Sequence, residues 1–326
     1  MKLYICGNGF DKHHGYKTGY EDYKKFLMEN YLHSFTAFER FEYLNISKTD
    51  RWSDLEESLS IDYYNCIDDA VSEYYPDLNN DSDSRWHEID IDLDEQTKFI
   101  YDFTGRYFLE WLHQVDFSNP QNLLNLDKST KYVTFNYTST LERVYNIPSG
   151  NIYHIHGYLD SIDCRDILDW FIPSFSTIEE AEITEQIQVD EMNNDTIRKQ
   201  IQFGSIGNNS EAIKNELEKK YGQDDFYSVS IKPGISHIIK FCDASSKSLQ
   251  KNFEALKLFI SDKNIDEVII MGHSILGVDK SYYSEIIVPA LKDCQWTFYY
   301  YSEDDRNKID KFINLFSLSK YTLKEW

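Results

Sequence analysis

The sequence contains no paired cysteine motif and no long apolar run. Because no two cysteines form a C-x-x-C pair, we expect neither a zinc cluster nor a disulfide framework. No run approaches the roughly 18 apolar residues that a membrane-spanning helix needs, and the few apolar residues after Lys2 are too few for a secretory signal. These absences predict a reduced, cytoplasmic protein that does not enter membranes. The five cysteines are Cys6, Cys66, Cys164, Cys242 and Cys294.

Positive charge is also scarce. The chain has 33 Lys and Arg against 56 Asp and Glu, which gives a formal net charge of −23. A protein of this charge repels nucleic-acid phosphates unless it carries a local basic patch, and the sequence has no Lys/Arg-rich run. We therefore expect no general nucleic-acid binding. Sixteen acidic residues lie between positions 50 and 95, which a solvated helical face and an acidic loop explain better than a cation or partner site.

The first chemical signal lies between Lys2 and Gly15. A short apolar run with strand character ends at Gly7-Asn8-Gly9, a turn that only small or left-handed-tolerant residues make. A strand that ends in glycines lets phosphates approach backbone N–H groups. The dinucleotide pattern G-x-G-x-x-G is incomplete, because Lys12 replaces the third glycine. A tight turn after a buried strand explains the same residues.

Apolar runs of strand length alternate with stretches of helical period along the rest of the chain. This alternation predicts a Rossmann-like α/β domain over residues 1–326, in which helices cover both faces of a parallel sheet. A helical insertion or cap at 20–120 and a second, irregular insertion at 158–227 interrupt it. Strands are predicted at 131–135, 151–155, 226–231, 267–271, 296–301 and 321–323. Helices are predicted at 20–32, 52–75 (with a Ser53/Glu56 capping box), 95–115, 139–145, 210–221, 247–260, 280–291 and 304–316, and a loop at 76–94.

Four predicted strands end in small or polar residues. Because ligands bind at the carboxyl edge of such sheets, we expect these ends to converge on one crevice. The four ends are Gly7-Asn8-Gly9, Asn136-Tyr137-Thr138, His156-Gly157 and Gly272-His273-Ser274.

The motifs GNGFD, WSDLEE, FNYTSTLE, HIHG and IIMGHSILGVDK together resemble the bacteriophage abortive-infection family AbiH. Their order is also similar, more distantly, to that of sirtuin-like NAD-consuming domains. That resemblance implies an NAD or NADP substrate, no metal, and catalytic roles for Asn136, which holds the ribose or a water, and His156, the general base. It implies dinucleotide contacts for Gly7, Asn8, Gly9, Phe10, Asp11, Thr138, Gly272, His273, Ser274 and Asp279. The acid usual after the sirtuin Asn is replaced by Tyr137-Thr138, and the zinc module is absent, which favours a hydrolase or transferase over a deacetylase.

Structural roles compete with these chemical ones. Asn136 is also placed to cap the helix near Ser139, and His156 is also explained as a buried histidine bonded to backbone. His273 suits a turn. Asp11 suits a ribose contact or a helix cap, and Asp279 suits the start of the next helix. His13 and His14 suit packing or solvent, with one of them at the mouth of a pocket.

The sequence therefore predicts a cytoplasmic antiphage effector that hydrolyses the nicotinamide–ribose bond and depletes the dinucleotide pool. A nucleotide-binding sensor or partner module without turnover is the main alternative, and a nuclease toxin is a third that the charge disfavours. The expected partners are the dinucleotide, a phage-derived trigger or co-encoded protein, and further copies of the chain.

Overall fold

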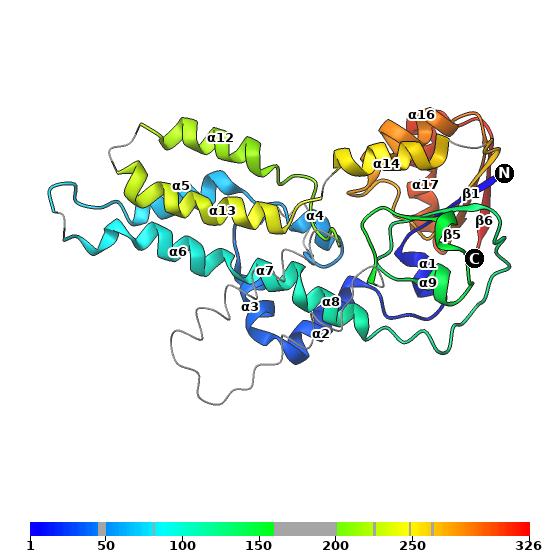
Figure 1. Cartoon of the computed structure of the whole chain (residues 1–326), viewed down its shortest axis with the longest axis horizontal. Coiled ribbons are helices and arrows are strands. Elements are labelled where there is room, and N and C mark those ends of the chain that lie inside the picture. The colour runs from blue at the N-terminus through cyan, green and yellow to red at the C-terminus, as the bar shows by residue number, and fades with distance from the viewer. Residues whose placement is uncertain (45–49, 81, 160–200, 224–225, 248, 262–263) are drawn as a thin grey trace. The chain divides into compact units, whose positions relative to one another are not determined.

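The computed structural model describes most of the chain. The described residues are 1–44, 50–80, 82–159, 201–223, 226–247, 249–261 and 264–326. They divide into two compact units, which Figure 1 shows as ribbons. The sheet unit comprises Met1–Asp22, Trp111–Asp163 and Ser248–Trp326, and the helical unit comprises Tyr23–Glu110 and Cys164–Lys247.

Six strands form the sheet, in the order β3-β2-β1-β4-β5-β6. They are β1 (Lys2–Cys6), β2 (Lys131–Thr134), β3 (Ile152–His154), β4 (Glu267–Met271), β5 (Gln295–Tyr300) and β6 (Tyr321–Glu325). Every neighbouring pair is parallel, so all carboxyl ends lie at one edge. The predicted parallel α/β sheet is confirmed.

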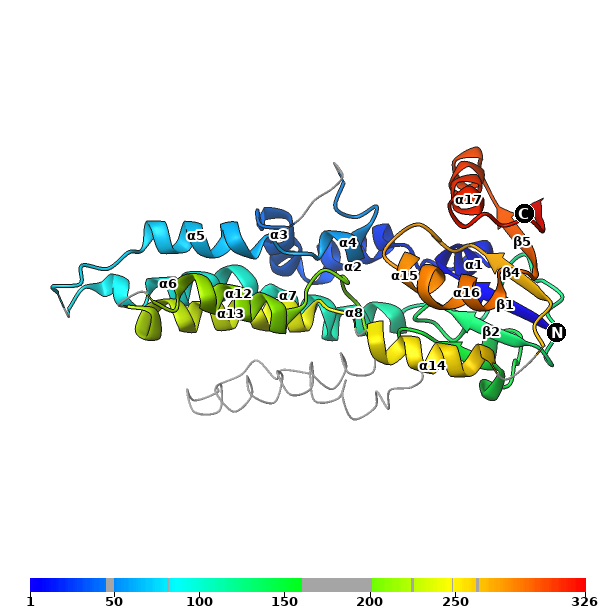
Figure 2. The same cartoon turned by 90° about the horizontal axis from the view of Figure 1, so that it is seen from above.

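Helices cover both faces of the sheet (Figure 2). Successive strand side chains point to opposite faces, so Leu3 and Ile5 pack on one face while Tyr4 and Cys6 pack on the other. The first face carries α14 (Leu249–Ser261), the run α15–η5–α16 (Lys280–Tyr282, Tyr283–Ile287 and Val288–Leu291) and α17 (Glu303–Phe316). The second face carries α1 (Asn8–His13) and α9 (Thr140–Arg143), and the short η2 (Ser149–Asn151) precedes β3. This two-sided burial explains why the central strands β1 and β4 are apolar without alternation.

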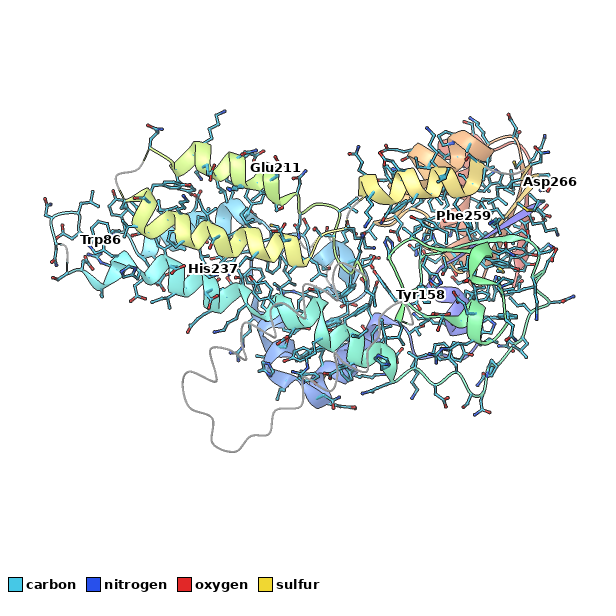
Figure 3. The ribbon with its side chains drawn as sticks, viewed as in Figure 1. Trp86, Tyr158, Glu211, His237, Phe259 and Asp266 are labelled. Atoms are coloured by element: carbon cyan, nitrogen blue, oxygen red, sulfur yellow. The ribbon has the colours of Figure 1, made fainter. Side chains whose placement is uncertain are left out.

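The helical unit is built from both segments that interrupt the sheet unit. Phe108 of the first segment stacks on Phe203 of the second, with ring centroids 3.9 Å apart, so the two segments share a core. His237 (Figure 3) lies 2.9 Å from a carboxylate oxygen of Asp90 and 3.1 Å from one of Asp94. It therefore links the helices at 232–244 and 88–97. The first segment carries α2 (Tyr20–Asn30), α3 (Leu32–Arg40), α4 (Leu55–Ser58), α5 (Tyr63–Glu73), η1 (Ser84–Trp86), α6 (Glu88–Thr97), α7 (Phe99–Thr104) and α8 (Arg106–His113). The second carries α12 (Ser210–Tyr221), η4 (Tyr227–Ile231) and α13 (Lys232–Ala244).

The predicted strand at 226–231 is wrong. Residues 227–231 form a π-helical turn that leads into α13. The buried residues Phe226, Ile231 and Ile235 are spaced by five and then four positions, which places them on one side of a helix that contains a π turn. Much of the predicted second insertion, 160–200, lies outside the described residues.

The predicted helix at 52–75 is two helices, α4 and α5, separated by a bridge between Leu44 and Ile61. The Ser53/Glu56 capping box is also wrong. Asp54 precedes the first helical residue, and the Glu56 carboxylate binds the buried Lys247 ammonium at 2.8 Å. The Glu56 side chain, which was expected to cap the helix, instead pairs with a buried charge from a distant segment.

Two further boundaries differ from the prediction. The segment predicted as a loop, 76–94, contains η1 and the first part of α6, and the predicted helix at 95–115 is divided among α6, α7 and α8. The aromatic stripe of that segment is buried as predicted. Its members are Phe99, Phe103, Tyr107 and Trp111.

Candidate functional site

The loops after the two central strands, β1 and β4, touch backbone to backbone. The Gly9 N–H donates to the Gly272 carbonyl at 2.8 Å, and the Gly7 N–H donates to the Met271 carbonyl at 3.1 Å. A Cβ on Gly9 would lie 2.7 Å from the Gly272 Cα, and one on Gly272 would lie 2.3 Å from the Phe10 nitrogen. Gly272 also has φ +62°, which an L side chain rarely adopts. These glycines are therefore required by contact between the loops.

The same contacts occupy backbone donors of the glycine turn. The Phe10 N–H donates to the Gly7 carbonyl at 2.8 Å, so three candidate donors of the turn, those of Gly7, Gly9 and Phe10, already have acceptors inside the protein. The Asn8 amide is also engaged, because its Nδ2 donates to the Thr18 carbonyl at 2.7 Å and its Oδ1 accepts from the Thr18 hydroxyl at 2.6 Å. A phosphate at this turn would have to meet other donors.

A buried carboxylate, Asp279, joins the ends of β3 and β4. Its Oδ1 lies 3.0 Å from Nε2 of His156, and its Oδ2 lies 3.4 Å from Nε2 of His273. Nδ1 of His273 lies 2.9 Å from the hydroxyl of Tyr283, which is buried. His156 is 1% exposed. Because a carboxylate only accepts hydrogen bonds, His156 presents an Nε2–H to Asp279, and the same carboxylate lies beside the ring of His273.

Asp279 stands at the first position before α15, yet its side chain makes no capping bond there. Asp279 thus stands at the start of a helix, as predicted, but its carboxylate contacts the histidines and not the helix. The ring of Phe135 packs 3.9 Å from that of His273 and 5.7 Å from that of His156. The two histidines consequently share an apolar wall as well as the acid.

A second buried carboxylate, Asp11, lies under the loop that follows β2. The hydroxyls of Thr138 and Thr140 donate to its two oxygens at 2.5 and 2.7 Å, and the amide of Asn136 is a third donor. Burial raises the pKa of Asp11 to about 6, although these hydrogen bonds favour the charged form. Asp11 thus ties α1 to the loop after β2.

Asn136 is held by this acid and not by helix capping. The residue that precedes α9 is Ser139, and no side chain caps that helix. Oδ1 of Asn136 is buried and accepts no hydrogen bond within the part of the chain that the structure describes. With its amide nitrogen fixed by Asp11, the side chain presents an acceptor oxygen in a set direction.

A cavity of about 540 Å³ adjoins the glycine junction in the sheet unit. The junction contributes Gly9, Gly272, His273 and Ser274, and the ends of β5 and α17 contribute most of the rest. The remaining lining residues are Lys12, His13, Asn122, Ile275, Tyr299, Tyr301, Asp305, Lys308 and Ile309. Of the two histidines at the end of α1, His13 lines the cavity, whereas His14, which follows the helix, is buried and bonded to the Phe10 carbonyl and the Tyr145 hydroxyl.

The predicted residues therefore form two groups within the sheet unit. Asp11, Asn136 and Thr138 make one hydrogen-bonded set, and His156, His273 and Asp279 make another. Gly9, Gly272, His273 and Ser274 border the cavity. The cavity residues of β5 and α17 were not predicted from the sequence. β5 ends in aromatic residues and not in glycine or asparagine, and those aromatic residues were the signal that the sequence offered.

The fold and these sites define an α/β protein with polar side chains gathered at the carboxyl edge of a parallel sheet. The model of the family described as bacteriophage abortive infection AbiH matches residues 3–300. The chain belongs to this family, as its motifs predicted. No curated protein and no solved structure matches the chain. Among the described helices, none has the length and apolar character needed to cross a membrane.

Proposed function

We propose that this AbiH-family protein is an antiphage effector that binds NAD or NADP at the carboxyl edge of the sheet and hydrolyses the nicotinamide–ribose bond. One observation carries the proposal. Asn136 and His156 follow the neighbouring strands β2 and β3, and each interacts with a buried carboxylate, Asp11 or Asp279. Paired, preoriented groups of this kind are what a hydrolytic site requires.

The strand order supports the same proposal. The chain runs outward from β1 to β2 and β3, then returns to β4 and continues to β5 and β6. This is the order of Rossmann-like dinucleotide folds, in which ligands bind where the direction of winding reverses. Here that point is the glycine junction between β1 and β4, beside the cavity. A sirtuin-like use of this crevice belongs to the proposal.

The proposed reaction breaks the bond between C1′ of the ribose and the nicotinamide nitrogen, and the bonding electrons leave with nicotinamide. The ribose passes through an oxocarbenium-like state, and a water oxygen then bonds to C1′. Asn136 accepts a hydrogen bond from that water or from a ribose hydroxyl through Oδ1. His156 takes the proton that the water loses.

Asp279 prepares His156 for this role. The Nε2–H of His156 faces the Asp279 carboxylate at 3.0 Å, so in the neutral ring Nδ1 is the basic nitrogen. The carboxylate then stabilises the imidazolium that forms when Nδ1 is protonated, as in other Asp–His pairs. A general base positioned in this way contributes about a hundred- to ten-thousand-fold in rate.

Burial favours a second candidate function, a nucleotide-binding sensor without turnover. His156 is 1% exposed and Asn136 is 7% exposed, which suits side chains that hold a binding loop in shape. In that case ligand binding would change the loop after β2 or β3 without chemistry.

Two measurements test the proposal. Purified full-length protein is incubated with NAD and with NADP, and both ligand binding and nicotinamide release are measured against a His156→Ala control. Because a constitutive hydrolase would deplete its own host, the total NAD and NADP pool is also measured in cells during phage infection, with and without the protein. Nicotinamide release by the purified protein, or a fall of the NAD and NADP pool in infected cells that have the protein, supports the proposal. Ligand binding without release in both settings supports the sensor, and neither binding nor release overturns both.

A further inference from the structure

The cavity beside the glycine junction has the size and place of a nucleotide site. Its volume of about 540 Å³ falls within the range of roughly 300–1,000 Å³ typical of small-molecule sites. It lies where the winding of the sheet reverses, on the β4 and β5 side of β1. Asn136 and His156 follow β2 and β3, on the other side of β1. A ligand that reached both would therefore extend along the edge of the sheet.

Three backbone donors of the glycine turn are not available to a phosphate here. The N–H groups of Gly7, Gly9 and Phe10 donate within the protein, and the close contact of Gly9 with Gly272 closes the space that a phosphate cradle would use. Side chains of the lining are therefore the candidates for the positive charge that a phosphate needs.

Two lysines line the cavity, one from each side. Lys12 belongs to α1 and forms no ion pair within the described ranges. Lys308 belongs to α17, and its ammonium lies 2.7 Å from Asp304, a pair whose side chains are 52% and 75% exposed. Such an exposed pair is weak, and an ammonium has three donors, so Lys308 can also bind an anion. In a chain with net charge −23, the two lysines of this lining are a local source of cationic donors.

Two carboxylates, those of Asp304 and Asp305, lie close to these lysines. Asp305, the acid in the lining, accepts a hydrogen bond from the Tyr301 N–H at 3.3 Å at the start of α17. Burial, with a smaller effect of His14, lowers the pKa of His13, so that ring is neutral at pH 7. The lysines therefore provide the positive charge.

An aromatic wall adjoins the lysines. Tyr299 and Tyr301 line the cavity, and the ring of Trp326 packs against both, with centroid distances of 5.6 and 4.9 Å. Trp326 also contacts His13 edge-on at 3.9 Å. Rings braced in this way keep their orientation before a ligand arrives, and a nucleobase stacks on such a surface.

We propose that this cavity binds the nucleoside 5′-phosphate half of the substrate, with its base on the Tyr299–Tyr301 wall and its phosphate on the ammonium groups of Lys12 and Lys308 and not on the glycine backbone. The identity of the ligand as half of a dinucleotide rests on the proposed function. The binding chemistry, an aromatic base with an adjoining phosphate, rests on the cavity alone.

The test measures binding to the full-length protein by calorimetry, with AMP, nicotinamide mononucleotide and inorganic phosphate as probes. AMP should bind more tightly than the other two. Lys12→Ala and Lys308→Ala should each weaken AMP binding about tenfold, and higher salt should reduce the difference. Matched controls are Lys17→Ala and Lys311→Ala, which remove exposed lysines outside the lining and should change AMP binding less than twofold.

Each other outcome is decisive. Equal binding of AMP and inorganic phosphate would show an anion site without a base site and would overturn the inference, as would equal losses in the lysine and control variants. AMP binding that depends on Lys12 and Lys308, without dinucleotide turnover, would leave this inference standing and remove the hydrolase. Turnover without lysine-dependent AMP binding would overturn this inference and leave the proposed hydrolase standing.

Discussion

Nε2 of His156 lies 3.0 Å from Oδ1 of Asp279, although 123 positions separate the two residues in the chain. His156 follows β3, which is the outermost strand on one side of the sheet, and Asp279 follows the central strand β4. The contact requires the loop after β4 to reach back over β1 and β2 toward β3. It is therefore a direct consequence of parallel strands that end at one edge.

The first prediction concerns chemistry at this edge. His156→Ala and Asn136→Ala should each reduce NAD turnover by about a hundred- to ten-thousand-fold, because each removes a positioned group from the reaction. Binding of the dinucleotide should survive His156→Ala, since the cavity beside β4 and β5 remains. Steady-state kinetics and ligand binding measure the two effects separately.

Melting curves of the same two variants provide the control. If His156 and Asn136 serve only to hold the loops, the loss of a buried hydrogen bond should cost about 1–3 kcal/mol of stability. A variant that melts early and still turns over NAD at the normal rate would show that the residue is architectural.

The second prediction concerns pH and Asp11. Burial raises the pKa of this carboxyl from 3.8 to about 6, so the folded protein holds the proton more tightly than the unfolded chain. Ionisation of Asp11 therefore lowers the free energy of unfolding as the pH rises from about 4 to about 6. A shift of about 2 pKa units corresponds to about 3 kcal/mol.

Asp11→Asn is uncharged at every pH and should remove this component. In denaturant titrations, the stability of Asp11→Asn relative to wild type should rise by up to about 3 kcal/mol between about pH 4 and pH 7. A difference that stays constant over this range would mean that Asp11 is ionised at low pH in the folded protein.

The third prediction concerns the glycine junction. Gly272→Ala should lower the free energy of unfolding by at least about 2 kcal/mol, because alanine is strained at φ +62° and its Cβ would lie 2.3 Å from the Phe10 nitrogen. Gly150→Ala is the control, since a Cβ there meets nothing within 4 Å. Thermal melting compares them, and similar stability of the two variants would contradict the observed loop contact.

The fourth prediction concerns the helical unit. The Lys247 side chain is 0% exposed and its ammonium lies 2.8 Å from the Glu56 carboxylate. Glu56→Gln removes a carboxylate charge from beside this buried ammonium and should cost about 3 kcal/mol. Asp68→Asn, which breaks the exposed pair with Lys220, should cost no more than about 1 kcal/mol. Equal small losses in denaturant titrations would mean that the Lys247 site is hydrated.

Much of the sheet could be predicted because its signal is local. The runs at β2, β4 and β5 are rich in apolar and aromatic residues, as buried parallel strands are, and the structure has them within a residue or two of the predicted bounds. Helices α12 and α17 were predicted for the same reason, since their apolar residues recur every three or four positions. The π turn at 227–231 was missed because a five-residue spacing resembles neither regular period.

The candidate site divides in the same way. That Asn136, His156 and Gly272 follow strands is visible in the sequence, and with parallel strands this alone places them along one edge. Their partners are not visible, because a hydrogen bond between Asp11 and Thr138, or between Asp279 and His156, depends on which loops meet. The cavity residues Lys12 and Lys308 are ordinary helix residues until α1 and α17 border one space.

The sequence by itself determined the family, the parallel α/β sheet and the set of polar strand ends, because each depends on residue order and on periods of two to four positions. Only the tertiary structure decided that the glycines after β1 and β4 pack against each other and that Asp279 lies beside two histidines. It also decided that the Glu56 carboxylate binds Lys247 and not a helix end. Such contacts form between segments distant in sequence, when buried polar groups must find partners after the elements have packed.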